Sequence, residues 1–284
     1  MPREAPVAAP PRPGKALGKP GRGRGEGWLY GRHAVAAALA NPARRWRRLA
    51  VLATEAEAAA ALVTAARARR LVAAQSAHEP RGEPRGEAVE VLDRAALNLL
   101  LPEGAVHQGW ALAVEPLAAS DLDEVLRATA GNVAGRSVIV VLDRVGDPHN
   151  VGAVLRSAAA FGAAAVVVAE HGAPAVTGVL AKAASGALER LPLVRAGNLS
   201  RVLDRLKEAG YWCCGLDATA PAPLASLDLG PRVALVLGAE GSGLRRLVRE
   251  HCDYLARLPT RPELLSLNVS NAAAIALYEL ARGG

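Results

Sequence analysis

Short apolar runs separated by helical stretches mark the second half of the chain. Each run holds five or six residues without a charged side chain, so both of its faces are apolar. Strands of this kind belong inside a parallel sheet whose two faces are covered by helices. The alternating order of strand and helix therefore predicts an α/β domain with a mostly parallel sheet over residues 137–284. The predicted strands are 138–142, 164–169, 212–216 and 233–237.

The first half of the chain divides into three segments of different composition. Residues 1–27 are rich in proline, glycine and arginine and carry almost no large apolar side chains, which predicts a disordered basic arm. Residues 28–115 predict a small α/β domain, and residues 116–136 predict a linker with one short helix. Within 28–115 the predicted helices are 31–40, 55–72 and 93–100, and the predicted strands are 47–53 and 110–115.

Charge and composition narrow the classes of partner. The net charge of +7 and the isoelectric point of about 9.8 favour a polyanion such as nucleic acid, because phosphate neutralisation releases counterions. Many soluble proteins are mildly basic, so charge alone leaves the partner open. The 3 cysteines fit no metal-ligand spacing, and we predict no metal site. The chain has no apolar run of about 18 residues and no signal-peptide pattern, which predicts a soluble, cytoplasmic protein.

Candidate chemistry is expected in the loops that follow the strands, because open parallel sheets bind ligands beyond the carboxyl ends of their strands. After the first strand, Asp143–Asn150 leads into a predicted helix over 151–161, for which Asn150 is a candidate N-cap. Arg156 lies in this otherwise small and apolar helix. Its guanidinium needs an anionic partner or solvent, and the sequence leaves both possibilities open.

Two later loops carry further polar groups. Gly238–Leu244 follows the last predicted strand, and its glycines allow a backbone to approach a ligand closely. Glu240 in this loop disfavours a bound diphosphate, although it could equally serve only to favour a helix dipole. The segment Leu258–Ser270 precedes a predicted terminal helix, with Ser266 or Asn268 as the candidate cap.

Together these three segments resemble the motifs of the SpoU/TrmH family of RNA 2′-O-ribose methyltransferases, members of the SPOUT superfamily. The matching stretches are DPHNVGAVLRSAAAFGA, LVLGAEGSGL, and LP followed by SLNVSNAAAIALYE, in family order. The stretch ASGALERLPLVR at 184–195 is also similar. Upstream, YGRHAVAAAL and HQGWA resemble the N-terminal RNA-binding domain of the bacterial 23S rRNA guanosine-2′-O-methyltransferase subgroup. The third motif departs from the family at Thr260 and Pro262, where methionine and glycine are usual.

The resemblance implies a fold, an assembly and an activity. The implied fold is SPOUT-like, with a trefoil knot in the C-terminal sheet domain, although topology rules make knots nearly absent from proteins. The implied assembly is a homodimer whose interface completes the active site. The implied activity is methylation of a ribose 2′-hydroxyl in RNA with S-adenosylmethionine as the donor, and a guanosine of 23S rRNA is the expected target.

The same resemblance implies roles for single residues. Arg156 would activate the 2′-hydroxyl, but arginine rarely deprotonates, so binding of the adjacent phosphate is the easier role. Asn150 would orient the ribose or Arg156, and Glu240 would pair with Arg156. The expected catalytic residues are Arg156, Asn150, Glu240, Ser266 and Asn268, and the expected cofactor-binding residues are Gly238, Leu258, Leu267, Ser266 and Asn268.

An RNA-docking surface is expected in residues 28–115. Several arginines there lie close in sequence to Trp46, and a basic cluster beside an aromatic ring suits looped RNA whose bases can stack. A solvated strand edge explains the same pattern equally well. The candidate RNA-binding residues are Arg32, Arg44, Arg45, Arg47 and Arg48.

Three alternatives to an rRNA methyltransferase differ in what they require of the sequence. A nicotinamide-dependent oxidoreductase needs a glycine fingerprint after its first strand, and Asp143–Asn150 lacks one. A non-catalytic RNA-binding or ribosome-assembly protein does not need the five candidate catalytic residues, all of which are present. A tRNA ribose methyltransferase keeps the chemistry, but relatives of that kind generally lack the N-terminal domain.

Overall fold

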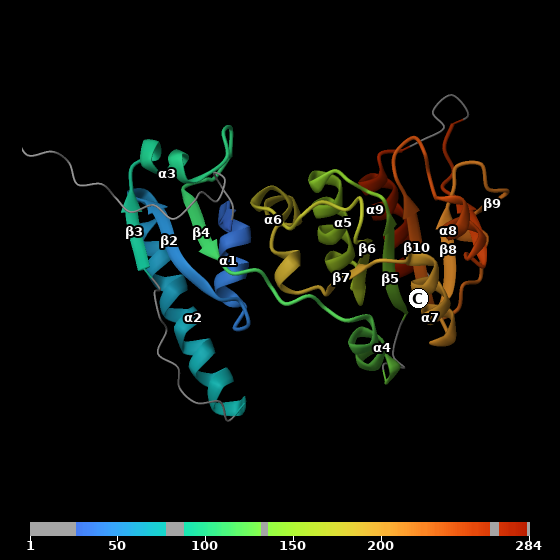
Figure 1. The fold of residues 1–284 in the computed structure, drawn as a ribbon, viewed down its shortest axis with the longest axis horizontal. Coiled ribbons are helices and arrows are strands. Elements are labelled where there is room, and N and C mark those ends of the chain that lie inside the picture. The colour runs from blue at the N-terminus through green and yellow to red at the C-terminus, as the bar shows by residue number, and fades with distance from the viewer. Residues whose placement is uncertain (1–26, 78–87, 132–135, 262–266, 283–284) are drawn as a thin grey trace, which may run out of the picture.

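The computed structural model describes residues 27–77, 88–131, 136–261 and 267–282. These residues form two α/β units that lie side by side and are joined by the extended segment after β4 (Figure 1). The predicted basic arm falls outside the described residues, except for Gly27. In the described part of the chain, no helix has the length and apolar character that crossing a membrane requires.

The N-terminal unit is a four-stranded sheet in the order β1-β4-β2-β3. β4 pairs antiparallel with both of its neighbours, and β2 pairs parallel with β3. The predicted helices and strands of this unit are confirmed, while β1 and β3 were not predicted. The strands are β1 (Trp28–Tyr30), β2 (Trp46–Leu52), β3 (Ala88–Leu92) and β4 (Trp110–Val114), and the helices are α1 (Arg32–Ala40), η1 (Ala53–Glu55), α2 (Ala56–Ala77) and α3 (Arg94–Leu100).

The C-terminal unit is a seven-stranded sheet in the order β7-β6-β5-β10-β8-β11-β9. Every neighbouring pair is parallel, which confirms the predicted parallel sheet. The four predicted apolar strands are its central members. The strands are β5 (Ser137–Asp143), β6 (Ala165–Ala169), β7 (Leu193–Ala196), β8 (Trp212–Leu216), β9 (Ala222–Pro223), β10 (Arg232–Gly238) and β11 (Tyr254–Arg257).

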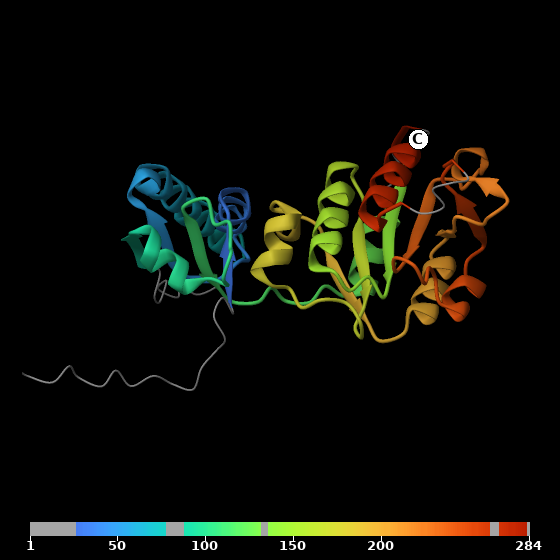
Figure 2. The same ribbon diagram turned by 90° about the horizontal axis from the view of Figure 1, so that it is seen from above.

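Helices cover both faces of this sheet, as Figure 2 shows from above. Alternate residues of β5 point to opposite sides, so Val140 belongs to one core cluster and Val141 to the other. Short 3-10 turns, η2 (Ala187–Glu189) and η3 (Leu224–Ser226), complete the unit. The first face carries α5 (Pro148–Ala160) and α9 (Val269–Arg282), and the second carries α4 (Leu122–Ala130), α7 (Leu199–Glu208) and α8 (Arg246–Glu250). The short helix α6 (Gly178–Ala184) packs against α5.

The two units are docked through a close contact between α1 and β1 on one side and α6 and η2 on the other. At Gly178 any larger residue would collide, because an added Cβ would lie 2.5 Å from the carbonyl oxygen of Trp28. The Lys182 ammonium donates to the Val106 carbonyl oxygen at 2.6 Å across the same contact. Desolvation by burial lowers the pKa of Lys182. The relative placement of the two units is therefore set by packed and hydrogen-bonded residues.

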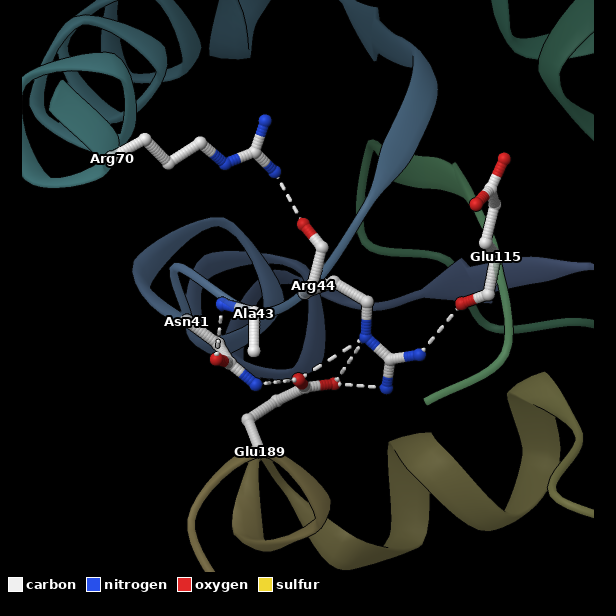
Figure 3. A network of polar contacts seen from close by, with 6 residues as sticks. All are labelled: Asn41, Ala43, Arg44, Arg70, Glu115 and Glu189. Atoms are coloured by element: carbon white, nitrogen blue, oxygen red, sulfur yellow. Dashed lines mark hydrogen bonds and ion pairs between the residues drawn. The ribbon is translucent and has the colours of Figure 1, made fainter. Parts of the chain in front are cut away.

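A buried ion pair lies at the centre of this contact (Figure 3). The Arg44 guanidinium donates to the Glu189 carboxylate at 2.6 Å, and the side chains are only 3% and 4% exposed. Asn41 donates to the same carboxylate at 2.8 Å, and Arg44 also donates to the Glu115 carbonyl oxygen at 2.9 Å. The expectation that Arg44 docks RNA is therefore wrong, because its charge is already paired inside the protein.

Candidate active site

Three loops meet at the carboxyl edge of the C-terminal sheet because β10 pairs with β5 in register, with Gly238 opposite Asp143. The loop after β5 leads into α5. Asp147 is the N-cap of this helix and accepts a hydrogen bond from the His149 amide at 2.9 Å. The interpretation of Asn150 as the N-cap is therefore wrong. Asn150 lies one turn further on, where its side-chain amide is available for other contacts.

Asn150, Glu240 and Asn268, one from each loop, form a hydrogen-bonded group that we call the polar cluster. The Asn150 amide donates to Glu240 Oε1 at 3.0 Å. The Asn268 amide donates to the same oxygen at 2.7 Å and to Asn150 Oδ1 at 2.9 Å. The Val269 backbone N–H also donates to Glu240 Oε1, at 3.2 Å. Residues that are 28 to 118 positions apart in the chain are thus held together at one point.

Asn268 has two functions in this arrangement. Its Oδ1 accepts hydrogen bonds from the Ser270 amide at 2.9 Å and from the Asn271 amide at 3.3 Å, as an N-cap does. Its Nδ2 is left to bind Glu240 and Asn150. Asn268 is thus a cap of α9, one of the two residues that the sequence indicated. The other, Ser266, lies outside the described residues, and so does Pro262.

The glycines after β10 allow the loop to fold back over the strand end. A Cβ at Gly238 would lie 2.1 Å from the carbonyl carbon of Gly243, so no other residue fits there. The Gly243 amide donates to the Ala239 carbonyl oxygen at 2.9 Å, and Gly241 and Gly243 have positive φ angles. This tight turn presents Glu240 to the other two loops. Gly238 is therefore required by the turn itself, whatever ligand the edge binds.

A buried carboxylate that sequence reasoning did not single out joins the first two loops. Asp143, the last residue of β5, is 0% exposed. Its Oδ2 accepts a hydrogen bond from the Arg245 backbone N–H at 2.8 Å, and its Oδ1 accepts one from Arg245 Nε at 2.6 Å. An acidic residue at the end of an otherwise apolar strand is the signal that could have identified it, because buried carboxylates are almost always paired.

Arg156 lies on α5 but away from the polar cluster. It lies six positions after Asn150, and at about 100° per residue this places the two side chains about 120° apart around the helix. Glu240 is bound by Asn150 and Asn268, and no contact joins it to Arg156. The expected Arg156–Glu240 pair is therefore not formed within one chain. Arg156 instead lines a cavity between the two units of the chain.

The residues expected to hold a cofactor flank the same edge. Leu258 directly follows β11 and is partly buried against the core. Leu267 precedes Asn268 and is 38% exposed. No group of histidine, cysteine, aspartate or glutamate side chains suited to a metal ion occurs within the described ranges.

The arginines of the N-terminal unit differ in their surroundings. Arg32 and Arg45 are exposed. Arg47 pairs with Glu115 and Arg48 pairs with Glu90, so their charges are partly compensated. Trp46 is only 3% exposed and does not offer a ring on which bases could stack. That part of the expected docking surface is therefore wrong.

The C-terminal unit is an α/β sheet with helices on both faces and a polar cluster at its carboxyl edge. Proteins of this class bind their ligands at that edge. Residues 137–278 match the SpoU rRNA Methylase family. A relative from Xylella fastidiosa strain 9a5c, 23S rRNA (guanosine-2′-O-)-methyltransferase RlmB, is 45% identical over 182 residues, 63% of this chain and 72% of its own.

Two further similarities extend over both units. The RlmB protein of Xylella fastidiosa strain Temecula1 is 38% identical over 258 residues, 90% of this chain and 96% of its own. The SpoU methyltransferase AviRb from Streptomyces viridochromogenes, solved with its cofactor AdoMet, superposes with a TM-score of 0.67 at 26% identity and covers 90% of this chain and 89% of its own. The chain belongs to the SpoU rRNA methylase family.

Proposed function

We propose that this protein transfers a methyl group from S-adenosylmethionine to the 2′-hydroxyl of a guanosine in 23S rRNA, and that it does so in the cytoplasm. The observation that carries the proposal is the joining of the three family motifs in one polar cluster by hydrogen bonds of 2.7–3.0 Å. The names of the RlmB relatives supply the substrate, and the similarity to one of them extends over the N-terminal unit as well.

S-adenosylmethionine fits the residues at the carboxyl edge. The exposed apolar surface of Leu267 and the half-buried Leu258 would cover the adenine ring, while backbone groups beside Gly238 and Asn268 would hold its polar atoms. The related AviRb was solved in complex with its cofactor AdoMet. Ser266 keeps its proposed role beside these residues. When bound, the cofactor supplies an electrophilic methyl group on a good leaving group.

The side chains of this protein would act mainly by positioning. Asn150 and Asn268 are held by Glu240, so their amides have fixed orientations before the substrate arrives. Alignment of two reactants at about 3–3.5 Å can lower a barrier by about 7–11 kcal/mol. Arg156 would bind the phosphate next to the target ribose and lower the pKa of its 2′-hydroxyl electrostatically, because guanidinium stays protonated.

Within one chain, Arg156 and Asn150 of the polar cluster lie on different sides of α5. A homodimer would bring Arg156 of one subunit to the polar cluster of the other. An exposed apolar face at the C-terminal end of α5 and on α9 supports this assembly. It contains Phe161, Ile275 and Tyr278, and the Phe161 and Tyr278 rings meet edge-on with centroids 6.1 Å apart. The return of α9 onto α5 and the insertion of β10 between β5 and β8 support the proposed trefoil knot.

The experiment that tests the function is transfer of a labelled methyl group from S-adenosylmethionine to total RNA of cells that lack the gene. We expect label in large-subunit rRNA, at one position that resists alkaline cleavage. Label in tRNA instead would show that tRNA, and not rRNA, is the substrate. If no RNA is labelled although S-adenosylmethionine still binds, the protein is a non-catalytic RNA-binding protein and not an enzyme.

The role of Arg156 is tested by Arg156→Ala. Its side chain is exposed and has no hydrogen-bond partner among the described residues, so the fold should be kept. We expect methyl transfer to be lost while S-adenosylmethionine binding persists. Arg201→Ala is the matched control, because Arg201 is an exposed arginine of α7 on the opposite face of the sheet. Turnover by Arg156→Ala at the rate of the control would refute the assignment.

A further inference from the structure

A cavity of about 490 Å³ lies between the two units, where α1 faces α5 and the end of α6. Its volume is in the range of small-molecule sites, about 300–1,000 Å³. Alanine side chains form much of its wall on both sides, which leaves the space open. They are Ala36, Ala37 and Ala40 of α1, Ala159 and Ala160 of α5, and also Ala163, Ala184 and Ala187.

Three basic side chains from three elements line this interdomain cavity. They are His33 of α1, Arg156 of α5, and Arg190, which follows η2. All three are exposed, and their side chains make no hydrogen bond or ion pair within the part of the chain that is described. None of the described lining residues is acidic. The cavity therefore combines open space with uncompensated positive charge.

The buried ion pair of Figure 3 engages the acidic residue that neighbours Arg190 in the chain. Glu189 directly precedes Arg190. Its carboxylate is bound by Arg44 and Asn41 and is only 4% exposed. Arg44 thus docks the two units and at the same time leaves Arg190 available to an external anion.

We propose that the interdomain cavity binds a backbone phosphate of the RNA substrate, held by Arg190 and His33 beside the phosphate that Arg156 contacts. This inference rests on the proposed function and names a part of the RNA path. Guanidinium groups bind phosphate through paired N–H donors, which suits Arg190. The three basic side chains come from three different elements, α1, α5 and the segment after η2. A polyanion can contact side chains spread over several elements, which a small free anion cannot.

The test compares Arg190→Gln with Arg201→Gln in the full-length protein. RNA affinity is measured from low to high salt, and S-adenosylmethionine affinity and the melting temperature are measured alongside. For Arg190→Gln we expect about tenfold weaker RNA binding, the size of a charged hydrogen bond. The slope of log K against log salt should fall by about 0.7–0.9, as for the loss of one phosphate contact. Cofactor affinity should be unchanged, and Arg201→Gln should behave as the unsubstituted protein.

A second variant, on a different wall of the cavity, tests the inference in case Arg190→Gln disturbs the local structure around residue 190. Ala160→Glu places a carboxylate on an exposed wall of the same cavity and should also weaken RNA binding. If both variants bind RNA as tightly as the unsubstituted protein, with the same salt slope, while that protein methylates RNA, the inference is wrong and the proposed function stands. Absence of both RNA binding and methyl transfer in the unsubstituted protein would overturn the two together.

Discussion

At the scale of single residues, Asp143 connects the end of β5 to the loop that carries Glu240. Its two oxygens bind the backbone N–H and the Nε of Arg245, so one carboxylate fixes both the path and the side chain of that loop. The polar cluster depends on the position of Glu240 to within hydrogen-bond distance. Asp143 therefore acts as a positioning residue for the candidate active site, although it does not touch the cluster.

We predict that Asp143→Asn weakens this connection. The amide keeps the size of the carboxylate but replaces one acceptor with a donor that faces Arg245. We expect a loss of about 1–3 kcal/mol in the free energy of unfolding and a raised KM for S-adenosylmethionine. Urea unfolding and steady-state kinetics measure both. The matched control is Asp123→Asn, since Asp123 pairs with Arg205 at the surface. If the two variants have the same free energy of unfolding and the same KM for S-adenosylmethionine, Asp143 does not position the loop that carries Glu240.

The three cysteines are predicted to be unreactive in the folded protein. Desolvation by burial raises the pKa of Cys213, Cys214 and Cys252 to about 12, from an ordinary value of 9.0. Only thiolate is nucleophilic, so a thiol reagent at pH 8 should label them only after unfolding in urea. Because the three thiols have a higher pKa in the folded protein than in the unfolded chain, they contribute to the free energy of unfolding. This contribution is fully present below pH 9 and is lost as the pH rises toward 12. Rapid labelling of the folded protein at pH 8 would contradict this.

At the scale of elements, Gly152 lets α5 pack tightly against α6. A Cβ at this position would lie 2.5 Å from the Ala183 Cβ and 2.7 Å from the Leu180 carbonyl oxygen, and backbone atoms cannot move aside easily. We predict that Gly152→Ala lowers the free energy of unfolding by about 1–3 kcal/mol through overpacking. Gly131→Ala is the control, because nothing lies within 4 Å of an added Cβ there. Similar melting temperatures for the two variants would refute the packing argument.

Secondary structure could be predicted where the sequence pattern was strong. The long apolar strands β5, β6, β8 and β10 were located to within about a residue because burial on both faces leaves no polar position. β9 has only 2 residues, and β3 is mostly exposed, so neither carries such a pattern. α7 was missed although Leu199, Val202, Leu203 and Leu206 follow helical spacing and are buried.

The sequence predicted which residues belong to the candidate site but not which of them contact one another. The motifs indicated Asn150, Glu240 and Asn268, and the structure joins all three. Which of them bind one another depends on strand order and helix rotation, which a list of motifs does not contain. Helical periodicity alone could have shown that Asn150 and Arg156 point to different sides of α5. The role of Asp143 depends on a partner 102 residues away and could not be derived from the sequence.

At the scale of the whole molecule, a charged pair is buried in the contact between the two units. Arg44 lies in a run of arginines that suggested an RNA surface, but its partner Glu189 is 145 residues away in the chain. Such a contact has no local signature. Deleting residues 1–115 would therefore expose Glu189 and the face of α6 that contacts β1. The truncated protein would lose the packing partners of Glu189 and α6 as well as an RNA-binding surface.

The docking of the units is tested by a double-mutant cycle. Removing one partner of a buried ion pair costs about 3–5 kcal/mol, because the other charge stays buried and unpaired. We therefore expect Glu189→Leu and Arg44→Met each to lower the melting temperature and to speed thermolysin cleavage in the exposed segment 116–120. The double variant removes both charges and should lose less than the sum of the two. The proposed RNA path crosses the contact between the units, so we expect loss of docking in the single variants to raise the KM for RNA. In the double variant the KM for RNA should return toward that of the unsubstituted protein. Additive losses would mean that the pair contributes nothing beyond its separate contacts.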